Sequence, residues 1–246
     1  EDCKDCDLII ITAGRNRKPG ETRLDLIAGN SAILKNVVDQ MKPHYTKGVI
    51  MIVSNPVDVL VYQCTKWMGL PNGMVFGTGC ILDSSRFTRL IADYTRLNTE
   101  VVKATIVGEH GDAQIPIWSR VSIAGVPIQE YCENVGLRWG ENIRKDISDK
   151  VREMGATIIK GKGRTHYGIA TCVCYLAEAV LNQRLTIAPV STMFQGEYGI
   201  EDVCLSVPSI IGVNGVEKRL EERWAEEEFL AFRQAAEKMR NVLKTL

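Results

Sequence analysis

The 246-residue sequence lacks the features that mark several large classes of protein. No apolar run approaches the ~20 residues that a helix needs to span a bilayer, so we expect no membrane protein. Neither sign of charge is in excess, because 30 Lys and Arg residues face 30 Asp and Glu residues. A chain without a positive field is poorly suited to nucleic acid. Its 45% of hydrophobic residues suffice for a buried core, which excludes intrinsic disorder as the main state.

Paired cysteine and histidine patterns are also scarce. Eight cysteines in a chain of this length do not make the dense disulfide framework of a small secreted domain. Cys3 and Cys6 form one CxxC pair, but no second pair follows, and the three histidines lie far apart in the sequence. We therefore predict reduced thiols and no metal site. Residues 1–7 lack the basic and apolar stretches of a signal peptide, so we predict a cytoplasmic protein.

A third absence is the Gly-x-Gly-x-x-Gly turn that cradles nucleotide phosphates. The sequence also has no initial methionine and reaches an apolar run, Leu8–Ile11, almost at once. That run, followed by Thr12–Gly14, is typical of a buried parallel strand. Since a central strand rarely begins a complete domain, we expect this sequence to be a fragment that lacks the first part of its domain.

Apolar runs and amphipathic stretches alternate over the first eighty residues. Strands are predicted at Leu8–Ile11, Gly48–Ser54 and Met74–Gly77, and helices at Arg23–Met41 and Val57–Met68. Alternation of this kind produces parallel βαβ units with right-handed crossovers. The fold class is therefore α/β, with part of a doubly wound parallel sheet at residues 1–80. Ligands of such sheets bind beyond the carboxyl ends of the strands. Those ends are residues 12–14, 54–56 and 77–79.

Residues 81–246 have a different pattern, which predicts a second domain of mixed α/β structure. Helices are predicted at Ile81–Tyr94, Glu141–Lys160, Tyr167–Leu181 and Glu221–Leu246. Strands are predicted at Val101–Val107, Ile115–Ile123, Leu185–Met193, Val203–Val207 and Ser209–Val213. Turns with Gly or Pro between the last three strands favour an antiparallel sheet. The last helix has the apolar spacing of a coiled coil, but it is short, and we expect it to dock on the sheet.

The densest group of chemically useful residues is Gly108-Glu-His-Gly-Asp112. A histidine between glycines, in a tight loop after a strand, is poorly placed for packing and well placed to present its imidazole to a ligand. Imidazole titrates near neutral pH, so His110 can both donate and accept a proton there. The alternative is a turn histidine without a function.

Asp83 and Arg86 form a second group, three residues apart and thus on one face of a predicted helix. By themselves they are most simply a surface ion pair. However, Arg86 follows the strand end at 77–79, where a planar guanidinium can bind a carboxylate through two hydrogen bonds. A carboxylate beside a catalytic histidine fixes its tautomer and stabilises the imidazolium. A third group, Arg15–Arg23, carries four cations and suits either an anionic ligand or a solvated loop.

Together these motifs resemble those of the L-lactate/malate dehydrogenase family. The matching segments follow the family's order: Thr12–Gly14, Lys18–Arg23, Val53–Asp58, Leu82–Arg86, Gly108–Asp112 and Pro189–Thr192. They span almost the whole chain, so chance similarity is negligible. The resemblance implies an oxidoreductase with a Rossmann NAD domain, here lacking its N-terminal part, followed by a mixed α/β catalytic domain. It also implies NAD as the cofactor, a small 2-oxo or 2-hydroxy acid as the substrate, and a homodimer or homotetramer.

The resemblance assigns catalytic roles to four residues. His110 would be the acid and base that protonates the substrate's carbonyl oxygen as hydride arrives from NADH. Asp83 would orient His110 and stabilise its charge, and Arg86 would hold the C1 carboxylate of the substrate. Arg23 would polarise the carbonyl group from a loop whose closure excludes water.

It also assigns binding roles. Asn55 would donate a hydrogen bond to the reacting oxygen, and Thr165 matches a threonine that touches the substrate in the lactate branch. The residues that would bind the cofactor are Gly14, Arg15, Asn36, Val53, Ser54, Asn55 and Thr78.

The sequence departs from the family at two places. The family begins with a strand, a glycine-rich turn, a helix and a second strand, and at ~30 residues per βαβ unit roughly 60–70 residues are missing here. Without them the pyrophosphate lacks a helix N-terminus to bind. In addition, some bacterial lactate dehydrogenases are activated by fructose 1,6-bisphosphate through an Arg and a His. Thr88 and Lys103 occupy the matching positions, so we do not expect this activation.

Arg17 determines which substrate the sequence favours. It lies six residues before Arg23. At the position that matches Arg17, lactate-type enzymes carry a neutral Gln and malate-type enzymes carry Arg. A cation there would pair with the second carboxylate of oxaloacetate, so malate and oxaloacetate are favoured. The alternative is lactate and pyruvate, because Lys18–Leu26, Thr165 and Pro189–Thr192 look more like the lactate branch. A second alternative is a catalytically dead, truncated form that acts only in assembly.

Overall fold

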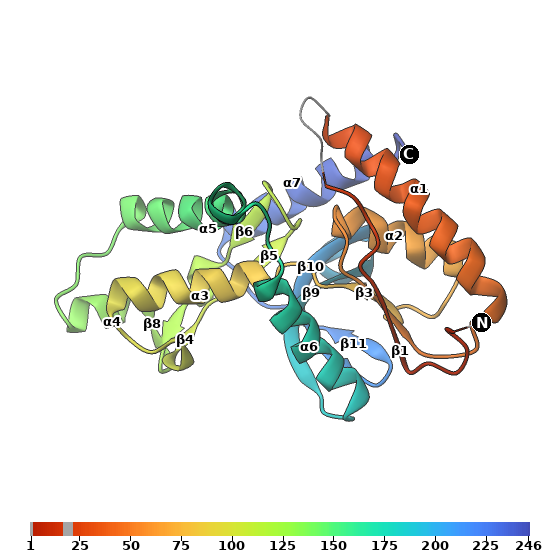
Figure 1. The fold of residues 1–246 in the computed structure, drawn as a ribbon. Coiled ribbons are helices and arrows are strands. Elements are labelled where there is room, and N and C mark those ends of the chain that lie inside the picture. Colours follow the sequence, from red (N-terminus) through yellow and green to blue (C-terminus); the bar gives the residue numbers. More distant parts are fainter. Residues whose placement is uncertain (1, 17–21) are drawn as a thin grey trace.

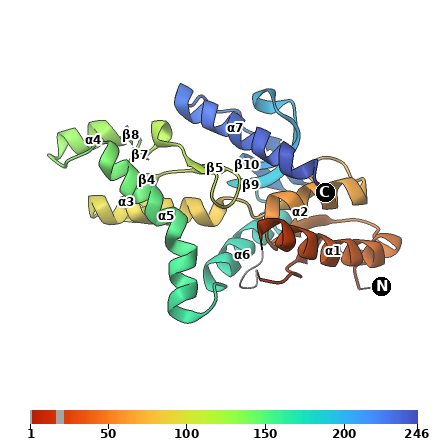
Figure 2. The same cartoon turned by 90° about the horizontal axis from the view of Figure 1, so that it is seen from above.

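A computed structural model describes residues 2–16 and 22–246, apart from the side chain of Arg23. Within these residues a main sheet has the strand order β1-β2-β3-β9-β10-β5-β6, with β11 paired to β10. A small second sheet has the order β4-β7-β8. In Figures 1 and 2, α1 and α2 lie at one end of the molecule, and α3, α4 and α5 lie at the other. The predicted α/β fold class is confirmed, with parallel strands first and a mixed region after them.

The parallel part of the main sheet contains the first three strands: β1 (Leu8–Ile11), β2 (Val49–Ile52) and β3 (Val75–Gly77). They are connected by α1 (Arg23–Met41), the short turn η1 (Lys42–His44) and α2 (Val57–Met68).

Both faces of the central strand β2 are covered. Ile50 and Ile52 pack in a cluster with residues of α1 and α2, whereas Val49 and Met51 pack in another cluster with α6 (Tyr167–Leu181). Successive side chains of a strand point to opposite faces, so a strand covered on both sides must be apolar throughout. This is why Val49–Ile52 was recognisable as a continuous apolar run.

The antiparallel part of the main sheet contains three later strands: β9 (Thr186–Gln195), β10 (Glu201–Gly212) and β11 (Gly215–Arg219), with the turn η4 (Glu197–Gly199) between the first two. The prediction of two separate strands at 203–207 and 209–213 was wrong, because residues 203–212 belong to one continuous strand, β10. Pro208 does not interrupt it. Pro208 lies opposite Pro189, so no backbone N–H is needed from either residue at this point of the ladder. The carbonyl of Pro208 accepts a hydrogen bond from the N–H of Leu220 (2.8 Å).

The two long strands predicted at 101–107 and 115–123 were also wrong, since each is divided between the two sheets. The parts in the small sheet are β4 (Val102–Lys103) and β7 (Ser122–Ile123), with β8 (Val126–Pro127) beside them. The parts at the edge of the main sheet are β5 (Ile106–Gly108) and β6 (Gln114–Pro116). The turn η2 (Thr99–Val101) directly precedes β4, and the turn η3 (Trp118–Arg120) separates β6 from β7. The loop that carries His110 joins β5 to β6.

Three helices pack around the small sheet. They are α3 (Ile81–Thr95), α4 (Ile128–Asn134) and α5 (Glu141–Lys162), and their shared core contains Phe87, Ile91 and Ile147. The sequence did not predict α4, which is only seven residues long. The division of the chain into 1–80 and 81–246 stays a prediction; β3 and β9, from the two parts, pair in one sheet.

The last helix, α7 (Glu226–Leu243), packs on the main sheet as predicted and does not form a coiled coil. Phe232 is fully buried and makes edge-on contacts with Trp224 and Tyr198, at ring-centroid distances of 5.1 and 5.4 Å. The carboxylate of Glu228 accepts hydrogen bonds from the backbone N–H groups of Ser119 (2.9 Å) and Ala225 (3.0 Å), which fixes the helix start. No helix among the residues 2–16 and 22–246 is both long and apolar enough to cross a membrane.

We predict that Phe232→Ala in the full-length protein lowers the free energy of unfolding by about 3–5 kcal/mol, because it leaves a cavity under α7. Leu230→Ala on the same helix is the control, since Leu230 is 55% exposed and its loss should cost less than about 0.5 kcal/mol. Urea titration followed by circular dichroism measures both. Equal losses in the two variants would show that α7 does not depend on the aromatic cluster.

Candidate functional site

The carboxyl ends of β1, β2 and β3 meet at one side of a pocket of about 520 Å³. Backbone hydrogen bonds align these ends: the N–H of Val53 donates to the carbonyl of Ile11 (2.9 Å), and the N–H of Thr78 donates to that of Ile52 (3.0 Å). The other walls come from α3, α5, α6 and the loop between β5 and β6. The predicted site residues that line the pocket are Gly14, Arg15, Val53, Ser54, Asn55, Thr78, Arg86, His110 and Thr165.

A close approach between two strand ends shapes the pocket floor. The hydroxyl of Ser54 donates a hydrogen bond to the carbonyl of Ala13 (2.7 Å), which holds the segment after β2 against the segment after β1. A Cβ at Gly14 would lie 3.3 Å from the Cβ of Ser54. A side chain at position 14 would therefore crowd the floor, so glycine keeps backbone accessible there.

Asn30 holds two of the pocket segments, and sequence reasoning missed it. It is 1% exposed, and its amide nitrogen donates to the carbonyls of Asn55 (2.6 Å) and Arg15 (3.1 Å). Its amide oxygen accepts from the backbone N–H of Arg15 (2.8 Å). The signal was present, because Asn30 falls between Ile27 and Leu34 on the apolar stripe of α1, where a polar side chain must find buried partners.

His110, Asp83 and Arg86 form one hydrogen-bonded group. The Nδ1 of His110 lies 2.6 Å from the Oδ2 of Asp83, and the Nη1 of Arg86 lies 3.2 Å from its Oδ1. The Asp83 side chain is 4% exposed, that of Arg86 14% and that of His110 25%. The carboxylate of Asp83 is thus enclosed, whereas the side chains of Arg86 and His110 line the pocket. With Nδ1 bonded to Asp83, the Nε2 of the imidazole is left to meet a ligand.

The pKa of His110 is raised above its ordinary value. Burial lowers the pKa of the imidazole, but the hydrogen bond to Asp83, the charge of Asp83 and the charge of Asp58 together outweigh burial and the opposing charge of Arg86. A raised pKa keeps the imidazole protonated to a higher pH than a free histidine. The group can therefore deliver a proton near neutral pH and take it back.

Asp58 is a second buried carboxylate beside His110, and sequence reasoning did not assign it a role. Its Oδ2 accepts a hydrogen bond from the backbone N–H of His110 (2.8 Å). Its Oδ1 accepts one from the hydroxyl of Ser191 (2.6 Å), which is fully buried in β9. Both residues lie inside segments that matched the family resemblance, but no pattern in the sequence connects them across 133 positions.

Three predicted residues are not placed at the pocket. Arg17 lies outside the described residues; Arg23 is the first residue of α1, but its side chain lies outside them too. Asn36 is exposed on α1, where its side chain accepts a hydrogen bond from Gln40 (2.6 Å). The reason is helical geometry: six residues beyond Asn30, Asn36 is about 9 Å further along the axis and turned to another face.

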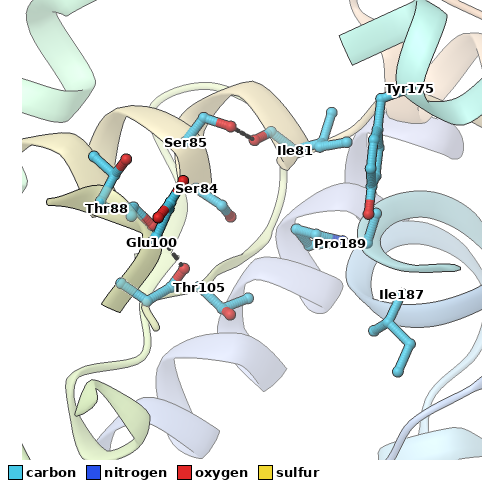
Figure 3. A pocket seen from close by; sticks show the side chains of 12 residues that line it. Ile81, Ser84, Ser85, Thr88, Glu100, Thr105, Tyr175, Ile187 and Pro189 are labelled. Carbon is cyan, nitrogen blue, oxygen red and sulfur yellow. Dashed lines mark hydrogen bonds between the residues drawn. The ribbon is translucent and has the colours of Figure 1, made fainter. Parts of the chain in front are cut away.

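A second pocket, of about 450 Å³, opens on another side of α3 (Figure 3). Ser84, Ser85 and Thr88 face Tyr175 and Ile187 across it. In the described part of the chain, Glu100 is the one charged residue of its lining. This pocket offers no imidazole and no cation for an anionic ligand, so the first pocket is the candidate active site.

The first pocket has the groups needed for proton transfer on a carboxylate-bearing substrate. It combines an imidazole with a raised pKa, an enclosed carboxylate that orients it, and a guanidinium that can grip a carboxylate. Among residues 2–16 and 22–246, no three His, Cys, Asp or Glu side chains gather as a metal site would need.

Comparison with known proteins agrees with this geometry. Residues 1–77 match the family model of the lactate/malate dehydrogenase NAD-binding domain, and residues 80–246 match that of the α/β C-terminal domain. The L-lactate dehydrogenase of Acetivibrio thermocellus is 37% identical over all 246 residues, which cover 78% of that relative. That of Thermoanaerobacterium saccharolyticum is 41% identical, with 79% of it covered. The crystal structure of the ligand-bound minor L-lactate dehydrogenase from Enterococcus mundtii superposes with a TM-score of 0.94 at 38% identity, over 100% of this chain and 78% of that one.

We predict that Asp83→Asn lowers the pKa of the His110 imidazole, because burial then acts without the opposing charge of that carboxylate. The measurement is an NMR titration of the His110 ring signals in the full-length protein. Asp93→Asn is the matched control, since Asp93 pairs with Arg89 on the exposed face of the same helix. A shift of equal size in both variants would mean that Asp83 does not stabilise the imidazolium.

Proposed function

The chain belongs to the lactate/malate dehydrogenase family, and we propose that it is an oxidoreductase that moves a hydride between NAD and a small L-2-hydroxy acid. The observation that carries the proposal is the group of His110, Asp83 and Arg86 at the strand-end pocket. Acid–base and carboxylate-binding functions lie side by side there, as a reaction on a 2-oxo acid requires.

NAD is the family's cofactor, and the pocket residues fit its nicotinamide end. Gly14 leaves backbone accessible beside Ser54, and Asn55 and Thr78 add polar groups at the neighbouring strand ends. We assign nicotinamide binding to Gly14, Arg15, Val53, Ser54, Asn55 and Thr78, which all line the pocket. Bound NADH supplies the hydride for reduction of the substrate.

His110 handles the proton of the reaction. During reduction its Nε2 gives a proton to the substrate's carbonyl oxygen, which becomes the hydroxyl of the product, and the imidazolium becomes neutral. During oxidation the neutral imidazole takes that proton back. Asp83, 2.6 Å from Nδ1, holds the ring in one orientation and stabilises the protonated form. Reduction therefore needs His110 protonated, and oxidation needs it neutral.

Arg86 holds the carboxylate of the substrate. Its Nη1 is bonded to Asp83, which fixes the plane of the guanidinium, and the side chain reaches the pocket. A guanidinium held in this way offers two parallel N–H groups to a carboxylate. Asn55 donates to the reacting oxygen, with its backbone held by Asn30, and Thr165 contacts the substrate from the loop between α5 and α6. The assignment of carbonyl polarisation to Arg23 rests on the resemblance.

The first candidate substrate pair is pyruvate and L-lactate. The support is that the relatives from Acetivibrio thermocellus and Thermoanaerobacterium saccharolyticum and the Enterococcus mundtii structure all carry the name L-lactate dehydrogenase. Pyruvate has a single carboxylate, which Arg86 would bind.

The second candidate pair is oxaloacetate and L-malate, and one specific residue, Arg17, favours it. A cation from the loop would pair with the second carboxylate of oxaloacetate. With pyruvate, the same cation would be left desolvated and unpaired, at a cost of roughly 3–5 kcal/mol by analogy with broken buried pairs. Since about 1.4 kcal/mol is tenfold, the preference would reach at least about 100-fold.

A different class of function, a catalytically dead module for assembly, has less support. A chain freed from catalysis has no reason to keep His110, Asp83 and Arg86 in hydrogen-bonded contact at the pocket. A homodimer or homotetramer stays a prediction, which the mass of the native protein in solution would test. The cytoplasmic location also stays a prediction.

We predict that His110→Asn in the full-length protein lowers the rate of 2-oxo acid reduction by a factor on the order of 10²–10⁴, with NADH binding retained. Asparagine cannot pass a proton, but it leaves the nicotinamide-binding residues in place. Steady-state kinetics and NADH fluorescence measure the two effects. His44→Asn is the control, because His44 is exposed in η1. Undiminished turnover in His110→Asn would remove His110 from the mechanism.

The substrate is decided by kcat/KM for pyruvate and for oxaloacetate, measured on the full-length wild type and on Arg17→Gln. If Arg17 selects the substrate, the wild type prefers oxaloacetate by at least about 100-fold and Arg17→Gln moves the preference toward pyruvate. A wild type that prefers pyruvate would establish the lactate candidate and reject the malate candidate. An unchanged preference in Arg17→Gln would show that this loop residue is not the selector.

A further inference from the structure

Asp58 connects three separate parts of the chain beneath the candidate active site. It is the second residue of α2 and 2% exposed. Its two carboxylate oxygens accept hydrogen bonds from the backbone N–H of His110 (2.8 Å) and from the hydroxyl of Ser191 (2.6 Å). One carboxylate thus joins α2, the loop between β5 and β6, and β9.

The burial of the Asp58 carboxylate has to be explained, because removing a charge from water costs free energy unless hydrogen bonds and nearby charges stabilise it. The plain reason would be a helix start, since a negative charge in the first turn of α2 interacts favourably with the helix dipole. That role requires no contact with His110. The hydrogen bond to the backbone of His110 could equally be made by a neutral asparagine. The charge itself is what remains to be explained.

We propose that Asp58 is a positioning residue for the reaction proposed above: its Oδ2 holds the backbone of His110, and its charge, together with that of Asp83, stabilises the imidazolium. The proposal rests on the proposed function, because only a reaction that cycles His110 between charged and neutral forms makes use of this charge. Asp58 acts through His110 and does not line the pocket itself.

The charged groups around His110 come from several elements, and their balance favours a protonated ring. Asp83 and Asp58 raise the pKa of His110, whereas burial and Arg86 lower it. Arg15 contributes a second cation to the same pocket, and Glu109 and Asp112, beside His110 in sequence, line a different pocket with residues of α1 and α7. Burial raises the pKa of the thiols of Cys80 and Cys172, that of Cys172 to about 11, so both stay neutral near pH 7.

The hydrogen bond from the Ser191 hydroxyl fixes the orientation of the Asp58 carboxylate. Ser191 is fully buried, and in the sheet it lies opposite Gly77, the last residue of β3. Its hydroxyl can rotate, so it donates to a carboxylate and can accept from an amide. This freedom allows a neutral replacement at position 58 that keeps both hydrogen bonds.

The test is Asp58→Asn in the full-length protein. Its amide oxygen can accept from the N–H of His110 while its NH₂ donates to Ser191, so these two hydrogen bonds are kept while the charge is removed. The pKa of His110 should fall, which moves the pH profile of kcat/KM for reduction to lower pH. At a pH above both pKa values, reduction should slow about tenfold for each unit of that fall, while at low pH the rates should converge.

Two variants separate this effect from a structural one. Glu228→Gln also neutralises a buried carboxylate that accepts backbone N–H bonds at a helix start, but at α7 and outside the pocket lining. It should lower stability and leave the pH profile unchanged. Asp58→Glu keeps the charge but places the carboxylate one methylene group further from the backbone. It should therefore reduce kcat without moving the pH profile to lower pH. If Asp58→Asn does not fold, Asp58→Ser provides the neutral variant, with a hydroxyl that can accept from His110.

An NMR titration distinguishes failure of this inference from failure of the proposed function. The chain has three histidines, so His110→Asn identifies the His110 signal in the ligand-free protein. A lowered His110 pKa in Asp58→Asn supports the charge assignment even if no 2-oxo acid is reduced, in which case the proposed function fails by itself. An unchanged His110 pKa in a folded Asp58→Asn protein overturns the inference and leaves Asp58 as the start of α2.

Discussion

The candidate site depends on the contact at which the parallel half of the main sheet joins the antiparallel half. Gly77 of β3 lies opposite Ser191 of β9, and β9 continues through β10 to Gly108 of β5, just before His110. Glycine at this position lets α2 pack against the end of β3, because a Cβ at Gly77 would lie 2.5 Å from a side-chain carbon of Val57 and 2.6 Å from one of Val61. Through this pairing, the strand ends suited to the nicotinamide and the loop suited to proton transfer become walls of one pocket.

Electrostatics at the pocket follow from the same junction. The junction brings Asp58, from the parallel half, under the backbone of His110, while Asp83 meets the imidazole from α3. Two carboxylates against one imidazole raise its pKa although burial acts in the opposite direction. Arg86 limits this rise and is held by the same carboxylate that orients the ring. One enclosed group, Asp83, thus aligns both the proton-transfer residue and the cation suited to a carboxylate.

Sequence reasoning succeeded where a local pattern has a single structural solution. Val49–Ile52 is apolar at every position, and α1 and α2 have the bounds predicted from their apolar stripes. It failed where distant segments decide the outcome. Pro208 marked a strand end in the sequence, but it sits opposite another proline and leaves β10 continuous. The predicted strand at 101–107 divides because its two halves find partners in different sheets.

The chemical groups of the site can be recognised in the sequence, whereas long-range contacts establish which of these groups meet. The loop around His110 and the i, i+3 pair of Asp83 and Arg86 are visible in sequence, because glycines and helical spacing are local properties. Asn30, Asp58 and Ser191 acquire their roles only through contacts across 15 to 133 positions. A buried polar side chain takes whichever partners the fold presents to it, and sequence spacing contains no information about that choice.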